Sequence, residues 1–452
     1  MKYIRSPYRL YVEIVNIIAD ILPEIPARMK SKLMNVSVAV LIFIGILKYC
    51  NKPIKMVTRF FYWSIILGTV MMIVFLIASI EKKRYDPDQK IRRPFWIGWM
   101  VCFVWILMMS FVHPPEDVCF VWAVVSLTIS PLIFITWEQN CRMEKMMDLV
   151  ADRTVTAAYL FVAASVFFVP FINKEALSVT TDYLGMGGNP NHNGMLSTGF
   201  YSAALYMLLS DKKRPFRYLI LMGVCIALSV VSVTRASILA VIMETFAAMT
   251  YILTHRALKN SKAAIVKQML VAVVIVTAAA VVAGYGFRAI DNAYIPLKAE
   301  AASEITEEKP EKEVAQKLDN LSSGRIHIWK AYIEKSTFWG NGWSEDPLIE
   351  GSHTTRWPHN TAIDILYVSG VPAAAGYVLW LGTSLVFIMR SIISKDRFRK
   401  EYLFSMIVIM GYFAEAMLEV TIYPMTNWLA FIALLGLIPV AYSEQRLEKS
   451  EE

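Results

Sequence analysis

Arginine, histidine and tryptophan gather in one polar stretch of an otherwise apolar chain. The stretch runs from Ser322 to Asn360 and contains Arg325, Trp329 and His359. Arginine offers a planar fork of donors that suits phosphate oxygens, and imidazole exchanges a proton near neutral pH. Because tryptophan rings can also stack on sugars, these residue types together indicate chemistry on a phosphate- or sugar-bearing substrate.

His359 is distinguished by its position among the six histidines. It follows Trp357 and lies directly before an apolar helix that is predicted to end at Gly370. At the surface of a bilayer a neutral imidazole can act as a general base, an effect worth about 10²–10⁴ in rate. A lone exposed histidine is more often a plain surface residue, so the position alone leaves both interpretations open.

Arg325 also has two interpretations. It follows Ser323-Gly324 and lies one helical turn before Trp329, which is a suitable place for a phosphate ligand. The same spacing fits a simple helix start, with Ser322 or Ser323 as the N-cap and Arg325 pointing into water.

Arg235 is the only charged residue between Arg217 and Glu244. This run is apolar enough to form two short membrane spans, and Arg235 is expected at the turn between them. An arginine inside the apolar zone costs about 2.5–3.5 kcal/mol on insertion scales. The side chain therefore either snorkels to the interface or binds an anionic ligand.

A loop from Gly185 to Asn193 is rich in glycine and asparagine. Its Asn189 and Asn191 offer amide donors and acceptors of the kind that sugar hydroxyls need. The same composition is typical of an ordinary tight turn.

Carboxylates give weaker signals. Asp86-Pro87-Asp88 has the spacing of a nucleotide-sugar metal motif, but lysines and arginines surround it, which favours a solvated loop. Glu244, Glu415 and Glu419 fall within apolar spans, where carboxylates often mark ion or proton sites. The sequence shows no phosphate-binding glycine loop and no Cys/His metal cluster, so we expect neither a metal nor another cofactor.

The elements that must position these residues are membrane helices. Of 452 residues, 56% are hydrophobic and 18% are charged, with a mean hydropathy of +0.47. The apolar blocks are long enough to cross a hydrocarbon core about 30 Å thick. The fold is therefore expected to be all-α, a polytopic membrane protein of about 12 transmembrane helices. The five cysteines indicate no disulfide framework.

The basic residues predict the sidedness. Most of the 45 Lys and Arg residues fall in alternate connections that begin with the N-terminus, which predicts cytoplasmic termini. The long polar connection is expected on the opposite, external face. The expected organisation is residues 1–32 cytoplasmic or interfacial, 33–286 transmembrane helices 1–9, 287–358 a large external loop, 359–443 helices 10–12, and 444–452 a cytoplasmic tail. Residues 8–22 are amphipathic and can lie along the inner interface.

The order of these motifs resembles the O-antigen ligase and polymerase superfamily. The matching residues are the Asn-Pro-Asn loop, Thr234-Arg235-Ala236-Ser237, Ser323-Gly324-Arg325, Gly340-Asn341-Gly342 and His359-Asn360. The superfamily's histidine motif continues with nine residues, a Gly, two residues and usually a second Gly. Here Gly370 matches the first, and Ala373 stands where the second is expected. The resemblance covers about Thr154 to Val420.

The resemblance implies a GT-C-like helical fold and a metal-independent glycosyltransferase. Such an enzyme moves a glycan from undecaprenyl diphosphate to an acceptor sugar on the external face of a bacterial cytoplasmic membrane. It further implies His359 as the base, Arg235 and Arg325 as holders of the diphosphate, and Asn360, the next residue of the histidine motif, as a substrate-binding residue. Trp329, Trp343 and Trp357 could stack on sugars, or serve as ordinary interfacial tryptophans.

The leading hypothesis is polymerisation of lipid-linked repeat units into O-antigen or capsule. The expected partners are the undecaprenyl-diphosphate-linked glycan, an acceptor glycan, the bilayer and a chain-length regulator, with no nucleic acid. A ligase that transfers the finished glycan to a lipid A core or another surface acceptor is the nearest alternative. A secondary transporter or flippase with Glu244 and Glu415 as coupling groups is the alternative of another class, disfavoured because no repeated halves are evident.

Overall fold

A computed structural model describes eleven segments of the chain, namely residues 5–47, 57–113, 117–140, 143–167, 190–210, 214–256, 262–293, 325–342, 358–393, 400–421 and 427–442. Helices make up most of these segments, and no strand occurs among the described residues apart from one isolated bridge between Ile91 and Tyr442. The expectation of an all-helical fold is confirmed for this part of the chain.

The helices follow one another in the order of the sequence. They are α1 (Arg5–Ile21), α2 (Ala27–Leu47), α3 (Val57–Ser79), α4 (Arg93–Val112), α5 (Asp117–Leu127), α6 (Ile129–Asn140), α7 (Met143–Phe167), α8 (Pro190–Ser210), α9 (Pro215–Val231), α10 (Arg235–Tyr251), η4 (Ile252–Arg256), α11 (Lys262–Ala293), α14 (Arg325–Lys335), α15 (Thr361–Ser369), α16 (Val371–Ile393), α17 (Lys400–Leu418), α18 (Trp428–Gly436) and η5 (Pro439–Ala441).

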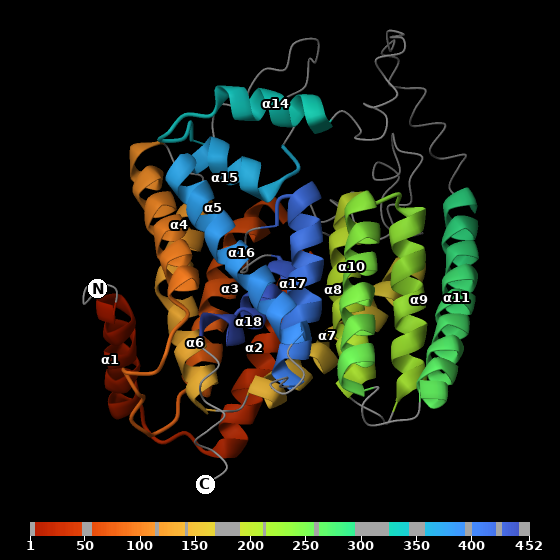
Figure 1. Cartoon of the computed structure of the whole chain (residues 1–452), viewed down its shortest axis with the longest axis horizontal. Helices are drawn as coiled ribbons and strands as arrows, with labels where there is room; N and C mark the ends of the chain where they lie inside the picture. Colours follow the sequence, from red (N-terminus) through yellow and green to blue (C-terminus); the bar gives the residue numbers. More distant parts are fainter. Residues whose placement is uncertain are drawn as a thin grey trace.

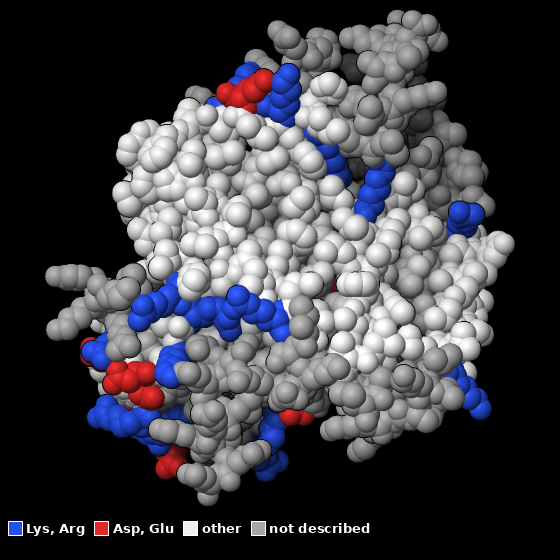
Figure 2. All heavy atoms as spheres, in the orientation of Figure 1, with Lys and Arg blue, Asp and Glu red and all other residues white. Residues whose placement is uncertain are grey.

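Most of the long helices stand side by side as a bundle, and α14 lies across one end of it (Figure 1). This end, at the top of Figure 1, is the upper end, and the opposite end is the lower end. Six of the described helical segments are long and apolar enough to cross a membrane by length and composition, and four shorter helices are also apolar. Uncharged surface covers the middle of the molecule in Figure 2, while charged side chains gather above and below it. The chain is a multi-pass membrane protein.

Glycines allow close helix packing on one side of the bundle. Helices α4 and α16 pack along each other. A Cβ atom added at Gly98 would lie 2.6 Å from the backbone nitrogen of Trp380, and one at Gly376 would lie 2.4 Å from that of Cys102. Such small residues let membrane helices approach closely enough for dispersion contacts to hold them together.

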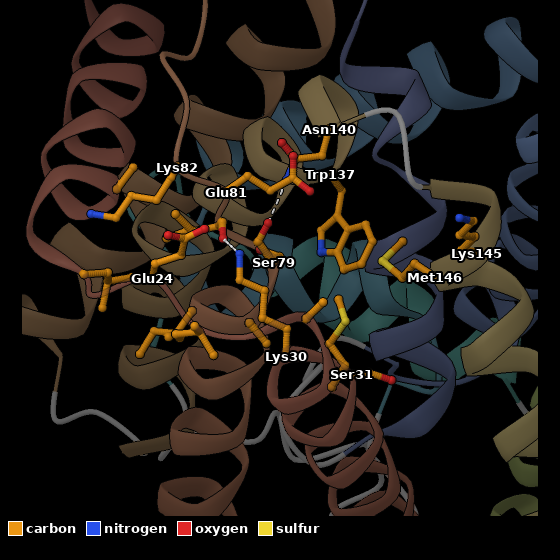
Figure 3. Close-up of a pocket in the computed structure, with 18 of the residues that line it drawn as sticks. Glu24, Lys30, Ser31, Ser79, Glu81, Lys82, Trp137, Asn140, Lys145 and Met146 are labelled. Carbon is orange, nitrogen blue, oxygen red and sulfur yellow. Dashed lines mark hydrogen bonds between the residues drawn. The ribbon is translucent and has the colours of Figure 1, made fainter.

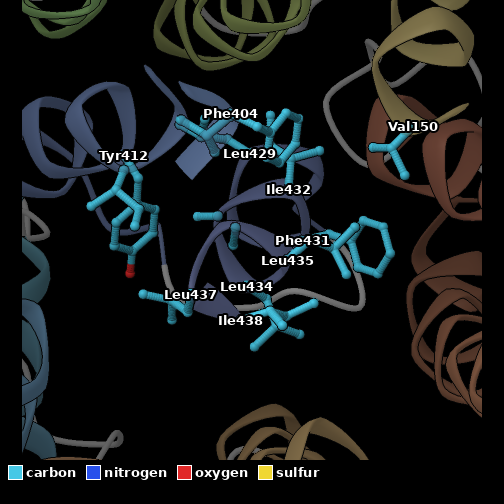
Figure 4. Packing of buried hydrophobic residues seen from close by; sticks show 14 of the residues in the cluster. Val150, Phe404, Tyr412, Leu429, Phe431, Ile432, Leu434, Leu435, Leu437 and Ile438 are labelled. Atoms are coloured by element: carbon cyan, nitrogen blue, oxygen red, sulfur yellow. The ribbon is translucent and has the colours of Figure 1, made fainter. Parts of the chain in front are cut away.

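Helix α18 is the buried centre of the bundle. All nine of its residues are buried, and in Figure 4 the side chains of Phe431 and Leu434, with that of Ile438 two residues beyond its end, point toward the surrounding helices. Helix α2 approaches it closely, since a Cβ at Gly45 would lie 2.9 Å from the Cβ of Trp428. Buried apolar side chains packed on all sides of a helix are typical of a bundle core.

Helix α1 lies at the lower left of the bundle in Figure 1. It packs through Tyr8, Val12 and Val15, which are buried. Ile17 and Ile21 lie on its exposed side, with 56% and 77% of their surface accessible. Exposed apolar side chains beside a protein-facing stripe suit a helix that lies along a membrane interface.

Candidate functional site

The upper end of the bundle holds the start of α15, the end of α17 and the overlying α14 (Figure 1). His359 comes two residues before α15, Arg325 is the first residue of α14, and Glu419 directly follows α17. The sequence separates these three residues by up to 94 positions, yet their side chains contact one another. The site is therefore made by tertiary packing.

His359 has an unusual backbone conformation that directs its ring. Its φ angle is 47°, in the left-handed region, where a non-glycine residue costs about 1–2 kcal/mol. Asn360 follows as the N-cap of α15, and its Oδ1 accepts a hydrogen bond of 3.1 Å from the backbone nitrogen of Ile363. Surrounding bonds must maintain such a strained residue, and strained residues often occur at functional sites.

Hydrogen bonds fasten the start of α15 to the end of α17. Asn360 Nδ2 donates to the carbonyl of Met417 at 2.9 Å. The Thr361 hydroxyl donates to the carbonyl of Glu419 at 2.9 Å and accepts from the backbone nitrogen of Thr421 at 3.1 Å. The side chain of Asn360, expected in the substrate site, is thus engaged in holding the two helices together.

Glu419 joins the histidine to the arginine. Its Oε2 lies 3.0 Å from His359 Nδ1, and its Oε1 accepts a hydrogen bond of 3.1 Å from Arg325 Nη2. Arg325 Nη1 also donates to the carbonyl of Leu418 at 2.6 Å. The Glu419 side chain is 8% exposed, that of Arg325 17% and that of His359 32%. The histidine ring is thus the most accessible of the three groups.

This arrangement has a chemical consequence for the imidazole. A carboxylate only accepts hydrogen bonds, so it favours the tautomer of His359 that carries its proton on Nδ1. The lone pair of Nε2 is then available to accept a proton from a hydroxyl group, as in other histidine–carboxylate pairs. Arg325 has five N–H donors, of which the hydrogen bonds to Leu418 and Glu419 use two.

The alternative in which Arg325 simply points into water is wrong. Arg325 does begin a helix, as expected, but the side chain turns toward Glu419 and is largely covered. Ser322 and Ser323, the expected N-caps, lie outside the described residues.

Trp329 lies one turn after Arg325 on α14. Its indole nitrogen donates to the carbonyl of Pro358 at 2.7 Å, which ties α14 to the residue before His359. Trp343 and Trp357, the other tryptophans expected near sugars, lie outside the described residues.

The Gly340-Asn341-Gly342 segment closes over the end of α15. Both glycines have positive φ angles, of 85° and 74°. The backbone nitrogens of Asn341 and Gly342 donate to the carbonyls of Tyr367 and Val368 at 2.8 and 3.1 Å. A Cβ at Gly340 would lie 2.4 Å from the Val368 oxygen, so only glycine fits this crossing.

Arg235 is the first residue of α10 and is exposed. It follows a tight turn in which Val233 has a φ angle of 53°. Because α10 packs along α17, and both reach the upper end in Figure 1, the start of α10 lies at the same end of the bundle as Glu419. Asn191 lies in the first turn of α8, and Asn189 lies outside the described residues.

Two further carboxylates lie deep between α8, α10 and α17. Ser202 Oγ donates to Glu244 Oε1 at 2.7 Å, and Thr198 Oγ1 donates to Glu415 Oε1 at 2.5 Å. Both glutamates are completely buried. The Glu244 carboxylate presses on Gly411, where an added Cβ would lie only 1.8 Å from its Oε1. Polar contacts of this kind hold membrane helices together.

The structure therefore brings Arg325 and His359 together and adds Glu419, whose partners the sequence did not reveal. The only signal was a carboxylate within an apolar span. Among the described residues, no group of three or more His, Cys, Asp or Glu side chains is arranged to hold a metal ion.

This combination defines a class: a helical membrane protein with a histidine, a carboxylate and an arginine at one end of its bundle. Residues 218–378, about a third of the chain, match the family model described as O-antigen ligase, so this part of the chain is similar to that family. The match begins in α9 and ends in α16, and it includes Arg235, Arg325 and His359. No curated protein and no solved structure matches the chain.

Proposed function

We propose that this protein polymerises oligosaccharide repeat units carried on undecaprenyl diphosphate, at the external face of the cytoplasmic membrane. The observation that carries the proposal is the contact of Glu419 with both His359 and Arg325. It joins a proton acceptor to a cation at one place on the surface of a membrane bundle. The match to the O-antigen ligase family supports the lipid-linked glycan as the donor.

The reaction follows from these groups. An acceptor sugar hydroxyl gives its proton to His359 Nε2 as its oxygen bonds to the anomeric carbon of the donor sugar. The bond from that carbon to the diphosphate oxygen breaks, and the electron pair leaves with the lipid diphosphate. Arg325, with Arg235 from α10, stabilises the negative charge that grows on the leaving group. No metal ion takes part in this scheme.

Glu419 has a double role in the scheme. It keeps the Nδ1 proton of His359 in place, and it stabilises the imidazolium that forms when Nε2 takes up the proton. It also fixes one edge of Arg325 and leaves the rest of the guanidinium for the diphosphate. Glu419 therefore acts as a positioning residue.

The proposal includes a membrane topology. The upper end faces outward, both termini are cytoplasmic, twelve helices cross the bilayer, and residues 287–358 form one large external loop. Trp329, Trp343, Trp357, Asn189 and Asn191 then lie on the side where glycans are exposed. A chain-length regulator would act on the same side.

A ligase is the second candidate, and the description of the matching family model favours it. Polymerase and ligase share the donor chemistry and differ in the acceptor. We place the polymerase first because the long loop and Ala373, in the position of the motif's second glycine, depart from the ligase pattern.

The experiment that tests the function uses the purified full chain in proteoliposomes. The only substrate supplied is a fluorescent repeat unit on undecaprenyl diphosphate. A polymerase forms a ladder of longer glycans without any second acceptor, whereas a ligase forms product only when a lipid A core is added. No product in either case, from protein that is folded by its melting curve, would overturn the proposal.

A further inference from the structure

A cavity of about 560 Å³ opens at the lower end of the molecule, away from His359 and Arg325. The end of α1, the start of α2, the end of α3, and parts of α6 and α7 line it. Its size falls within the range of about 300–1,000 Å³ that is typical of ligand pockets. In Figure 3, Lys145 and Met146 line one side, Lys82 and Glu24 the other, and Lys30 lies between them.

The charged groups of the lining favour an anion. Three lysines, Lys30, Lys82 and Lys145, outnumber the two carboxylates, Glu24 and Glu81. Lys30 Nζ donates to the carbonyl of Ile80, and Lys82 Nζ donates to that of Asp20 at 3.1 Å. Lys145 forms no ion pair with any residue that the structure describes, so its ammonium group is available.

A further cation lies at the rim. Asn35, which lines the cavity, accepts two hydrogen bonds from the Arg153 guanidinium, of 3.1 Å from Nε and 2.9 Å from Nη2. Arginine and lysine together are the usual ligands of phosphate oxygens.

Two polar atoms of the wall lack a partner. Trp137, only 3% exposed, has an indole nitrogen without a hydrogen-bond partner among the described residues, and so has the Oδ1 of Asn140. Buried polar groups without partners cost free energy. Both atoms are themselves buried, so the lysines, and not these two atoms, are the groups that can reach a ligand in the cavity.

The walls of the cavity indicate that its ligand is a lipid. Part of the wall is apolar, formed by Leu22, Met34, Ile77, Met146 and Leu149. Leu22 directly follows Ile21 of α1, and the exposed apolar side chains of Ile17 and Ile21 suit a membrane interface. A ligand that enters from this side needs an apolar chain as well as an anionic group.

We infer that this cavity binds an anionic phospholipid, with the phosphate of its head group near Lys30, Lys145 and Arg153 and an acyl chain along the apolar wall. The site is separate from the reaction centre and lies at the opposite end of the bundle. A lipid held there joins α1 and α2 to α6 and α7.

Native mass spectrometry of the full chain in mild detergent tests this inference. Delipidated protein is titrated with dioleoylphosphatidylglycerol, with dioleoylglycerol as the matched lipid that lacks phosphate, and with glycerol 3-phosphate as the soluble phosphate. We expect saturable binding of one phosphatidylglycerol, and binding at least about tenfold weaker for the other two probes. Such a difference corresponds to the loss of one charge-assisted hydrogen bond.

Two variants locate the site. Lys145→Ala removes the available ammonium group, and Ser31→Trp fills the cavity without changing its charge. Each should weaken phosphatidylglycerol binding about tenfold or more, while Lys330→Ala, exposed on α14 at the upper end, should leave it unchanged. Unchanged binding in both cavity variants would overturn the location. Equal binding of dioleoylglycerol would overturn the recognition of phosphate, and equal binding of glycerol 3-phosphate would overturn the lipid.

Discussion

Replacement of Glu419 by glutamine tests the chemistry of the site with the smallest change of shape. Glutamine keeps the size of the side chain, but it has one acceptor oxygen and one donor nitrogen where glutamate has two acceptors. Both present partners of Glu419, His359 Nδ1 and Arg325 Nη2, are donors in the proposed tautomer. The amide can satisfy only one of them.

Either orientation of the amide harms the reaction. If its nitrogen faces His359, the ring is driven into the tautomer that carries the proton on Nε2, and the base is lost, an effect worth about 10²–10⁴ in rate. If its nitrogen faces Arg325, two donors meet and a charge-assisted hydrogen bond worth about 1.5–3 kcal/mol is lost. The less costly orientation sets the outcome, so we expect kcat to fall at least about tenfold, with a much smaller change in KM.

The assay is the initial rate of chain growth in proteoliposomes that contain a lipid-linked repeat unit. A matched control is Glu334→Gln on α14, where an exposed carboxylate lies 3.7 Å from Lys330. Exposed pairs of this kind contribute about 0–1 kcal/mol, so this variant should behave as wild type. Activity of Glu419→Gln within about threefold of wild type would refute the positioning role.

The remaining predictions concern the parts that surround this centre. Arg325→Lys keeps the charge but loses the fork, so we expect the rate of chain growth to fall about 10–10²-fold; an unchanged rate would exclude it as a diphosphate ligand. Gly411→Ala places a methyl group against the Glu244 carboxylate and should destabilise the fold by about 1–3 kcal/mol. The melting temperature should fall, and an unchanged melting curve would contradict the close contact between Glu244 and Gly411. Asn360→Ala removes the N-cap of α15 and should lower the stability of the protein by about 0.5–2 kcal/mol. Much of the activity should also be lost, because the backbone that holds His359 loses its support. Full activity would show that the N-cap does not position the His359 ring.

Local features of the fold could be predicted from the sequence. The apolar run after His359 predicted a helix that ends at Gly370, and α15 covers Thr361–Ser369 with Gly370 as its C-cap at a φ angle of 88°. Glycine ends such a helix because it adopts positive φ without a steric cost. Periodicity and glycine are local signals, so one sequence suffices to read them.

The pairing within the site could not be predicted, because it depends on contacts between distant segments. Glu419 lies 60 residues after His359 and 94 after Arg325. No periodicity or sequence motif links residues at these separations. In the sequence, Glu419 looked like Glu244 and Glu415, three carboxylates in apolar spans. Only the packing separates them, since it gives Glu244 and Glu415 hydroxyl partners in the interior and Glu419 charged partners at the upper end.

The sequence predicted an amphipathic helix at α1, but it did not show that α1 has two apolar stripes. The apolar stripe that includes Leu10, Ile17 and Ile21 is largely exposed, and a second stripe with Val12 and Val15 packs on the bundle. A single sequence does not distinguish an apolar face that meets lipid from one that meets protein, because both environments exclude water.

The central claim is that the imidazole of His359 takes the proton of the acceptor hydroxyl. A single-turnover experiment on His359→Gln, which removes the base, measures it directly by following the joining of two repeat units on the lipid carrier. We predict that this variant binds the lipid-linked donor as wild type does, while the rate of glycosidic bond formation falls at least about 10²-fold. Bond formation at the wild-type rate would contradict the account.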